Sequence, residues 1–257
     1  RSAGVPLGEL AEVVLGIKTG DDSRFIVEGD RPPGESYVRC VRGREVAPWQ
    51  SSGPGAWLRY DPEEMRAVHG ARPRRRESFE RPEKLLVRET SGTRLIAAFD
   101  DKGRFPLDTL HCVLVKEGSA ASLWYLLAIL NSGPASFYYG LHHPGPHVKA
   151  SELRALPVPP PAPCSQRERE LSLQMIEWIE MCELDCSDGV SAESTAARER
   201  LKRHGEETRD DVALRTALLE ELARLLTRST EPEVRDRGSA VLDEVVAAAY
   251  GMAGDES

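Results

Sequence analysis

The spacing of apolar positions along the chain changes near residue 160. Before that point, short runs rich in Val, Ile, Leu and Thr alternate with Gly, Pro and Asp turns, which is typical of β-strands. After it, leucines and valines recur three and four residues apart, which is typical of amphipathic helices. The pattern predicts an α+β protein, with a β-rich mixed domain over residues 1–160 and a C-terminal helical region over 161–257.

The densest strand signal lies between residues 81 and 115. Apolar runs over 85–90 and 93–99 flank a Ser91-Gly92 reversal, and Asp100-Asp101-Lys102-Gly103 makes a second turn before the run 110–115. We therefore expect three strands in a meander, with Arg88 and Arg94 near the first turn. An edge that carries two guanidinium groups beside hydroxyls suits contact with a polyanion.

The N-terminal stretch predicts a helical turn, a strand and a glycine-containing loop over residues 6–20. Further strands are expected over 25–27, 38–46 and 56–60. The loop glycines permit a close backbone approach, but a P-loop is excluded because GxxxxGK[ST] is absent. The loop is either a plain turn or a segment that faces a ligand.

Helical segments surround and follow these strands. Residues 121–131 are apolar nearly all round, which predicts a buried helix that stops at Asn131-Ser132-Gly133-Pro134, and short helices are expected from 137 and over 151–156. The proline-rich stretch 157–163 predicts a stiff connector and a domain boundary. Beyond it, the pattern predicts helices over 166–186, 192–205, 210–227 and 233–251.

The net charge of −8 hides an uneven distribution. Residues 1–163 hold 22 basic and 20 acidic side chains, the remainder holds 12 and 22, and the stretch 39–94 holds 13 and 8. The N-terminal part therefore contains a basic region that suits a nucleic acid. The alternative is that arginines such as those in 72–76 form a solvated surface, paired with nearby glutamates.

Catalytic and metal-binding signatures are missing from the sequence. It contains no GxSxG, HExxH or GxGxxG after a strand, and no NPPY or DPPY segment of the kind that amino-group DNA methyltransferases use. Asp100-Asp101-Lys102 matches only the bare pattern of some metal-dependent nucleases and falls in a turn. The His142, His143 and His147 group lacks a carboxylate or Cys at ligand spacing, and the pair Cys182 and Cys186 lacks two further zinc ligands. We expect neither a catalytic nor a metal site.

The compartment is predicted from the same sequence. No apolar run reaches the roughly 18 residues of a membrane span, and a signal peptide is not recognisable. The five cysteines have no framework spacing. These features predict a cytoplasmic protein with reduced thiols, and the missing initiator Met indicates a processed chain or a piece of a longer one.

Several short blocks in a fixed order resemble a known family. They are LGIKTGDDSRFI at 15–26, VRGREV at 41–46, WLRYDPE at 57–63, FERPEKLLVRET at 79–90, DTLH at 108–111, YLLAILNS at 125–132 and VKASELRALPVP at 148–159. Together they are similar to the TaqI-like C-terminal specificity domain of adenine-N6 DNA methyltransferases and type II restriction-modification enzymes. The tail LDEVVAAAYGM at 242–252 resembles the closing helix of many such proteins.

The resemblance implies that residues 1–160 form a target-recognition domain for double-stranded DNA. Its partner would be a methyltransferase catalytic domain, in the same chain or in another subunit, that binds S-adenosylmethionine, and this chain itself would hold no cofactor. Arg88 and Arg94 are the expected base readers and the run 74–76 the expected phosphate clamp. The full set of expected DNA contacts is Lys18, Arg42, Arg44, Arg74, Arg75, Arg76, Arg88, Arg94, His111 and Lys149.

Two alternatives remain open at this point. The chain could be a type I-like specificity subunit. It could also be a protein-interaction scaffold whose acidic helical region recruits a partner. Binding of DNA that weakens steeply with salt would separate recognition of a polyanion from a scaffold role.

Overall fold

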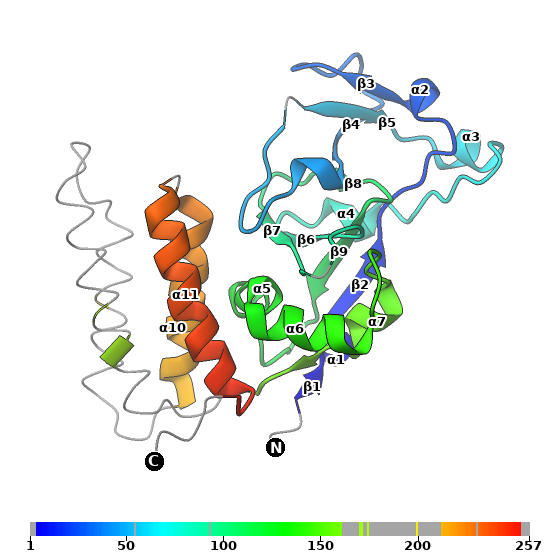
Figure 1. The fold of residues 1–257 in the computed structure, drawn as a ribbon. Coiled ribbons are helices and arrows are strands. Elements are labelled where there is room, and N and C mark those ends of the chain that lie inside the picture. The colour runs from blue at the N-terminus through cyan, green and yellow to red at the C-terminus, as the bar shows by residue number, and fades with distance from the viewer. Residues whose placement is uncertain are drawn as a thin grey trace, which may run out of the picture. The chain divides into compact units, whose positions relative to one another are not determined.

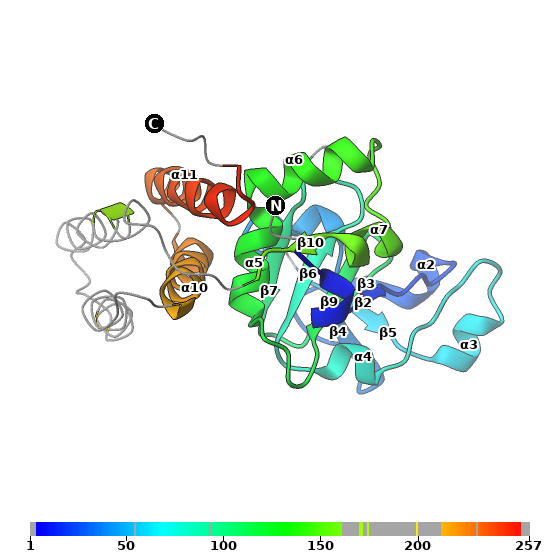
Figure 2. The same cartoon turned by 90° about the horizontal axis from the view of Figure 1, so that it is seen from below.

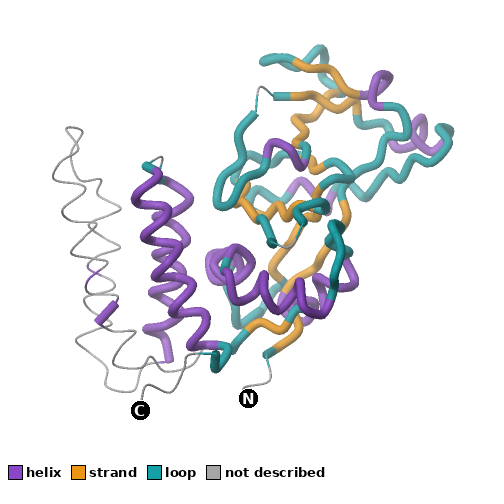
Figure 3. Tube along the Cα trace, in the orientation of Figure 1, coloured by secondary structure: helices purple, strands orange, loops and turns teal. Residues whose placement is uncertain are grey.

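The fold combines helices and sheets in two compact units. The computed structural model describes residues 4–53, 55–92, 94–160, 170–171, 174, 199, 212–229 and 231–252. One unit comprises Val5–Pro157, and the other comprises Arg1–Gly4 with Val158–Ser257. The predicted α+β class is confirmed, since strands and helices mix in the first unit and helices dominate the described part of the second (Figure 1, Figure 3).

A four-stranded antiparallel sheet forms the centre of the first unit. Its strands are β2 (Ala11–Leu15), β9 (Leu110–Val115), β6 (Lys84–Arg88) and β7 (Ala97–Asp100), in the order β2-β9-β6-β7. The predicted strands are confirmed, but the predicted meander is wrong, because β9 pairs with β6 and not with β7. The chain that leaves β7 first forms β8 (Phe105–Pro106), which pairs in parallel with a strand of another sheet.

A buried ionic group explains why the segment after β7 is not a simple hairpin turn. Asp100 is fully buried and its carboxylate lies 3.1 Å from Lys84 Nζ and 2.6 Å from Arg104 Nε. Lys84 also donates hydrogen bonds to the carbonyl oxygens of Phe79 and Arg81. Buried charges require such partners, so this ion pairing holds Asp100 inside the fold and directs the chain toward β8.

The second sheet has the strand order β3-β5-β4-β8. Its other strands are β3 (Ile26–Glu28), β5 (Ala56–Arg59) and β4 (Tyr37–Val41), close to where the sequence predicts them. The short helices α2 (Asp22–Phe25), α3 (Pro62–Arg66) and α4 (Glu77–Glu80) and the 3-10 turn η1 (Gly43–Glu45) connect the strands. A shared core of buried side chains, including Phe25, Leu58, Phe79 and Leu114, joins the two sheets.

Helices cover the other face of the four-stranded sheet. They are α1 (Leu7–Leu10), α5 (Leu123–Asn131), α6 (Gly133–His142) and α7 (Ala150–Ala155), and Figure 2 shows α5, α6 and α7 on one side of the strands. The predicted buried helix is confirmed, since every residue from Tyr125 to Asn131 is buried. The second helix begins at Gly133, earlier than predicted, because the Ser132 hydroxyl caps it by accepting a hydrogen bond from the Ala135 N–H. The short strands β1 (Val5–Pro6) and β10 (Pro157–Val158) pair with each other.

Two C-terminal helices bury the apolar stripes that the sequence predicts. They are α10 (Val212–Arg228) and α11 (Pro232–Ala249), and they contact each other. Leu218, Leu222 and Leu226 are buried on the first helix, and Leu242 and Val246 on the second. The helices expected over 166–186 and 192–205, with Cys182 and Cys186, lie outside the described residues. Among the helices that are described, none is long and apolar enough to cross a membrane.

Candidate nucleic-acid interface

One end of the four-stranded sheet gathers most of the predicted DNA contacts. The antiparallel register brings together the last residue of β2, the first of β9 and the last of β6, with Leu15 opposite His111 and Arg88 opposite Leu110. We call this the Arg88 end of the sheet and define it by the segments that leave or enter it: residues 16–18, 88–91 and 108–110. In Figure 1 the chain crosses from this end of β2 toward the second sheet.

The loop after β2 brings Lys18 to this end. Gly16 donates its N–H to the Leu110 carbonyl, and Ile17 forms a parallel bridge with Leu107. A Cβ on Gly16 would lie 2.1 Å from the Leu107 carbonyl oxygen, so only glycine permits this approach. The predicted close approach is therefore to the protein's own backbone. Lys18 is exposed and exchanges backbone hydrogen bonds with Arg72.

Arg42 and Arg44 reach the same end from the second sheet. Between them, Gly43 donates its N–H to the Thr109 hydroxyl at 2.8 Å. Both guanidinium groups approach Glu28, at 2.6 Å for Arg42 and 3.8 Å for Arg44, and the Arg44 side chain remains 72% exposed. Arg42 is thus largely a structural partner of Glu28, whereas Arg44 is available to a ligand.

Arg88 and Arg94 occupy the connection between β6 and β7. This connection is not the tight Ser91-Gly92 reversal that the sequence predicts, because residues 89–91 pair with residues 146–148: the Ser91 N–H donates to the Pro146 carbonyl and the Val148 N–H to the Glu89 carbonyl. Arg94 is exposed on the connection. Arg88 is half-buried, and its Nε is buried with no hydrogen-bond partner among the described residues.

The same pairing places Lys149 and His111 differently. Lys149 follows Val148, has a 69% exposed side chain, and lies 2.9 Å from Glu152. His111 is only 2% exposed and its Nε2–H donates to the Val148 carbonyl at 2.5 Å. Burial lowers the pKa of His111, which favours the neutral ring. The expectation that His111 contacts DNA is therefore wrong: the histidine holds residues 146–149 against the sheet.

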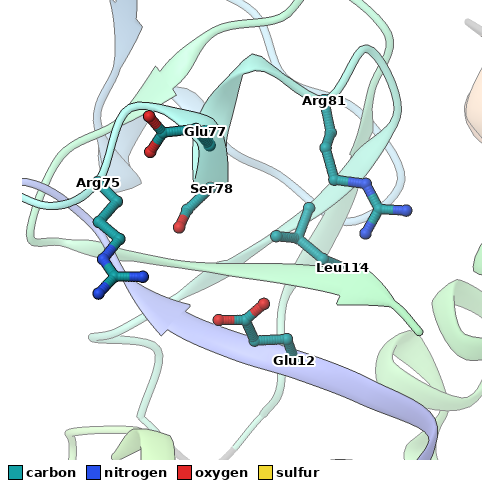
Figure 4. A pocket seen from close by; sticks show the side chains of 6 residues that line it. All are labelled: Glu12, Arg75, Glu77, Ser78, Arg81 and Leu114. Atoms are coloured by element: carbon teal, nitrogen blue, oxygen red, sulfur yellow. The ribbon is translucent and has the colours of Figure 1, made fainter. Parts of the chain in front are cut away.

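Arg74, Arg75 and Arg76 do not join this group. Arg75 lines a cavity of about 630 Å³ together with Glu12, Glu77, Ser78, Arg81 and Leu114. Figure 4 shows Arg75 and Arg81 on opposite sides of that cavity, with Glu12 projecting from β2. Because Glu12 pairs with Leu114 far from Leu15 and His111, the cavity lies toward the other end of the sheet.

The neighbouring residues of the run have other roles. Arg76 pairs with Glu80 at 2.5 Å and lies over the rings of Tyr60 and Phe105. The carbonyl oxygen of Arg74 accepts a hydrogen bond from the Tyr60 hydroxyl. The alternative of a surface run paired with nearby glutamates thus describes Arg76, while Arg75 has no ion pair among the described residues.

Carboxylates that were not among the predicted contacts also lie at the Arg88 end. Glu89 is 3.0 Å from His147 Nδ1 and accepts a hydrogen bond from the Thr90 hydroxyl. Asp108 is half-buried, and burial raises the pKa of its carboxyl while the nearby Lys18 lowers it. The sequence feature that could have identified these two carboxylates as site residues was their position at strand ends, next to basic residues.

No group of His, Cys, Asp and Glu side chains able to hold a metal ion occurs in the part of the chain that the structure describes. Within that part, the thiols of Cys40 and Cys112 are free and buried, and burial raises the pKa of each to about 12. Both are therefore protonated and unreactive at neutral pH.

Comparison with known proteins confirms the resemblance read from the sequence. Residues 38–158 match the family model of the TaqI-like C-terminal specificity domain. Over those residues the chain is similar to this family of specificity domains. None of the curated protein sequences compared with the chain matches it.

Two solved structures are similar in part. The type IIL restriction-modification enzyme MmeI in complex with DNA is 16% identical with a TM-score of 0.45, over 98% of this chain and 34% of that one. The HsdS subunit from Thermoanaerobacter tengcongensis is 12% identical with a TM-score of 0.31, over 94% of this chain and 43% of that one. The chain thus spans less than half the length of either protein.

Proposed function

We propose that this chain recognises a specific double-stranded DNA sequence for a site-specific adenine-N6 DNA methyltransferase or restriction-modification enzyme. The single observation that carries the proposal is the gathering of Lys18, Arg44, Arg88, Arg94 and Lys149 at one end of a sheet inside a specificity domain. Basic side chains that share one surface neutralise phosphates and fix the position of a duplex.

The residues divide into two kinds of contact. Lys18, Arg44 and Lys149 are exposed and have long side chains, which suits phosphate contacts that carry no sequence information. Arg88 has a partly buried stem, so its guanidinium group has a restricted direction, which suits the bidentate contact of arginine with guanine. Arg94 lies on the adjoining connection and is the second proposed base reader.

Chemistry on the DNA belongs to a separate catalytic domain in this proposal. That domain, in the same chain or in another subunit, would bind S-adenosylmethionine and transfer the methyl group. This chain would hold the duplex in register while the target adenine leaves the helix. A type I-like specificity subunit would perform the same recognition step, so the Arg88 end has the same role in either arrangement.

The test compares two lysines at opposite ends of the sheet. Lys18 lies at the Arg88 end, and the exposed Lys102 follows β7 at the other end. Binding of a labelled duplex is measured at several salt concentrations. We expect Lys18→Ala to reduce the slope of log affinity against log salt by about 0.9, because one phosphate contact is lost, and Lys102→Ala to leave it unchanged. Equal effects of the two variants, or no salt-dependent binding by the unaltered chain, would contradict the proposal.

A further inference from the structure

The Arg88 end contains the carboxylate of Asp108, and phosphate binding does not explain why a carboxylate lies there. Asp108 donates its N–H to the carbonyl of Ile17, next to Lys18, and the following Thr109 accepts a hydrogen bond from Gly43, between Arg42 and Arg44. A carboxylate in that position repels phosphate, so it weakens a surface that only neutralises DNA. A carboxylate beside these basic residues suits a ligand group that donates a hydrogen bond.

Asp108 has no partner of its own, unlike the other acidic side chains around it. Glu28 is paired with Arg42, Glu89 with His147, and Asp22 accepts a hydrogen bond from the Thr19 hydroxyl. For Asp108, no ion pair and no side-chain hydrogen bond to another residue occurs in the described parts of the chain. Burial raises the pKa of its carboxyl, Lys18 lowers it, and Asp22 and Glu89 raise it again, so the net direction in the free protein is upward. A bound donor would therefore stabilise the charge.

The backbone around Asp108 is held on both sides. Its own N–H donates to the Ile17 carbonyl at 2.9 Å, and the Thr109 carbonyl accepts from the Glu89 N–H at 2.9 Å. Gly16 and Gly43 pack against Leu107 and Thr109, where an added Cβ would lie 2.1 Å and 2.8 Å from the respective carbonyl oxygens. The Asp108 side chain therefore projects from a backbone segment that is held in place. A fixed position of this kind is needed to recognise a base edge, whereas contact with the DNA backbone does not require it.

The chemistry of the major groove selects one base for such a group. Guanine presents only acceptors there, and thymine an acceptor and a methyl group. Adenine presents an amino donor next to the N7 acceptor, whereas the N4 amino group of cytosine has no acceptor beside it. An ionised carboxylate only accepts hydrogen bonds, so it fits cytosine and is repelled by the other edges.

We propose that Asp108 is a specificity-determining residue that accepts a hydrogen bond from the N4 amino group of a cytosine in the recognised site. This inference rests on the proposed function, because it assigns one base contact within the same DNA-binding surface. It adds a direct preference for cytosine to the guanine contact proposed for Arg88.

The experiment selects bound sequences from a pool of randomised duplexes with the full chain and two variants. Asp108→Asn removes the charge and adds a donor, which suits adenine. Asp101→Asn removes the same charge from an exposed residue at the opposite end of the sheet, and serves as the matched control. Thermal unfolding of all three proteins shows that they are folded.

We expect the unaltered chain and Asp101→Asn to select a site with a fixed cytosine. Asp108→Asn should lose roughly tenfold of the preference for that cytosine, shift toward adenine at the same position, and bind other duplexes at least as tightly. If the unaltered chain selects a site and Asp108→Asn selects the identical one, this inference fails while the proposed function stands. If the unaltered chain selects no sequence, the proposed function fails and this inference fails with it.

Discussion

Individual charged residues in this domain differ sharply in what they do. Asp100 and Lys84 are fully buried against each other and against Arg104, while Asp101, the next residue, is exposed. A buried charge that loses its partner is costly, because the remaining charge has neither water nor a counter-ion. Adjacent aspartates should therefore respond very differently to the same substitution.

We expect Asp100→Asn to destabilise the domain by about 3–5 kcal/mol, because Lys84 keeps its charge inside the core. Asp101→Asn should stay within about 0.5 kcal/mol of the unaltered protein. Chemical denaturation of the three proteins measures the difference. Similar midpoints for the two variants would show that the buried ion pairs do not support the fold.

The carboxylate of Glu152 makes the stability of the fold depend on pH in the acidic range. It accepts hydrogen bonds from Lys149 Nζ at 2.9 Å and from the Tyr139 hydroxyl at 2.7 Å, and these contacts lower its pKa from 4.5 to about 2. A pKa that is lower in the folded than in the unfolded state stabilises the fold above the unfolded pKa, and this contribution is lost as the pH falls.

The expected result is a stability gap between the unaltered protein and Glu152→Gln that is complete above pH 4.5 and closes as the pH falls toward 2. Thermal unfolding across that range measures it. A gap that does not change with pH would mean that Glu152 contributes only through the shape of its side chain.

Secondary-structure elements in the first unit are joined by side chains as well as by strand pairing. Asn131, the last residue of α5, accepts a hydrogen bond from the Ala97 N–H through Oδ1 and donates one to the Ala97 carbonyl through Nδ2, both at 2.9 Å. The same carbonyl accepts from the Trp49 N–H at 2.8 Å. A helix and a loop thus complete the hydrogen bonds along the outer edge of β7.

Asn131→Ala should destabilise the domain by about 1–3 kcal/mol, since the buried Ala97 N–H loses its acceptor. Hydrogen exchange identifies the cause, because the Ala97 amide should lose more protection than the amide of Ala98, which is paired with Leu86 in β6. Equal losses at both amides would indicate a general loosening of the fold.

The sequence predicts the elements of this fold far better than their pairing. The apolar runs around Leu86, Ala98 and Val113 mark three strands because burial leaves a local pattern. The order of these strands in the sheet depends on long-range contacts that leave no local sequence pattern, such as the burial of Asp100 against Lys84 and the pairing of β8 with β4. Likewise, the sequence predicts only that a helix ends at Asn131. That its side chain bonds to the backbone of β7 is seen only in the folded structure.

The candidate site shows the same limit. Basic residues near the strand ends were predictable from composition, and Lys18, Arg88 and Lys149 do gather at one end of the sheet. The burial of His111 was not predictable from the sequence, because it depends on the approach of Val148 from a loop that is distant along the chain. Asp108 was not among the predicted contacts, because its lack of a partner depends on the two loops that Gly16 and Gly43 bring beside it.

At the scale of the whole first unit, the basic residues proposed to contact DNA occupy two regions. Lys18 lies at the Arg88 end, while Arg75 lies near Glu12 at the other end of β2. The six residue steps from Glu12 to Lys18 span at most roughly 20 Å, at about 3.3 Å per residue in an extended strand. Lys18 exchanges backbone hydrogen bonds with Arg72, three residues before Arg75, so the separation is below that limit. A duplex that contacts both regions must extend beyond the Arg88 end by fewer than about 6 base pairs, at about 3.4 Å each.

Arg75→Ala should therefore weaken binding of a long duplex and have no effect on a short one limited to the recognised site. Arg88→Ala should change the sequence preference with both. Binding measurements with nested duplexes that share one recognised site test this. A loss of affinity for the short duplex in Arg75→Ala would place both regions on one compact contact surface.

The glycine between Arg42 and Arg44 has a consequence for how such a domain changes over time. Gly43 is fixed by the peptide opposite it, since any side chain there would collide with the carbonyl of Thr109. Arg42 on one side is paired with Glu28, but the exposed side chain of Arg44 on the other side is under no such constraint. Evolution can therefore exchange the chemical group at the position of Arg44 beside a fixed glycine, altering preference for a new target without rebuilding the backbone that presents it.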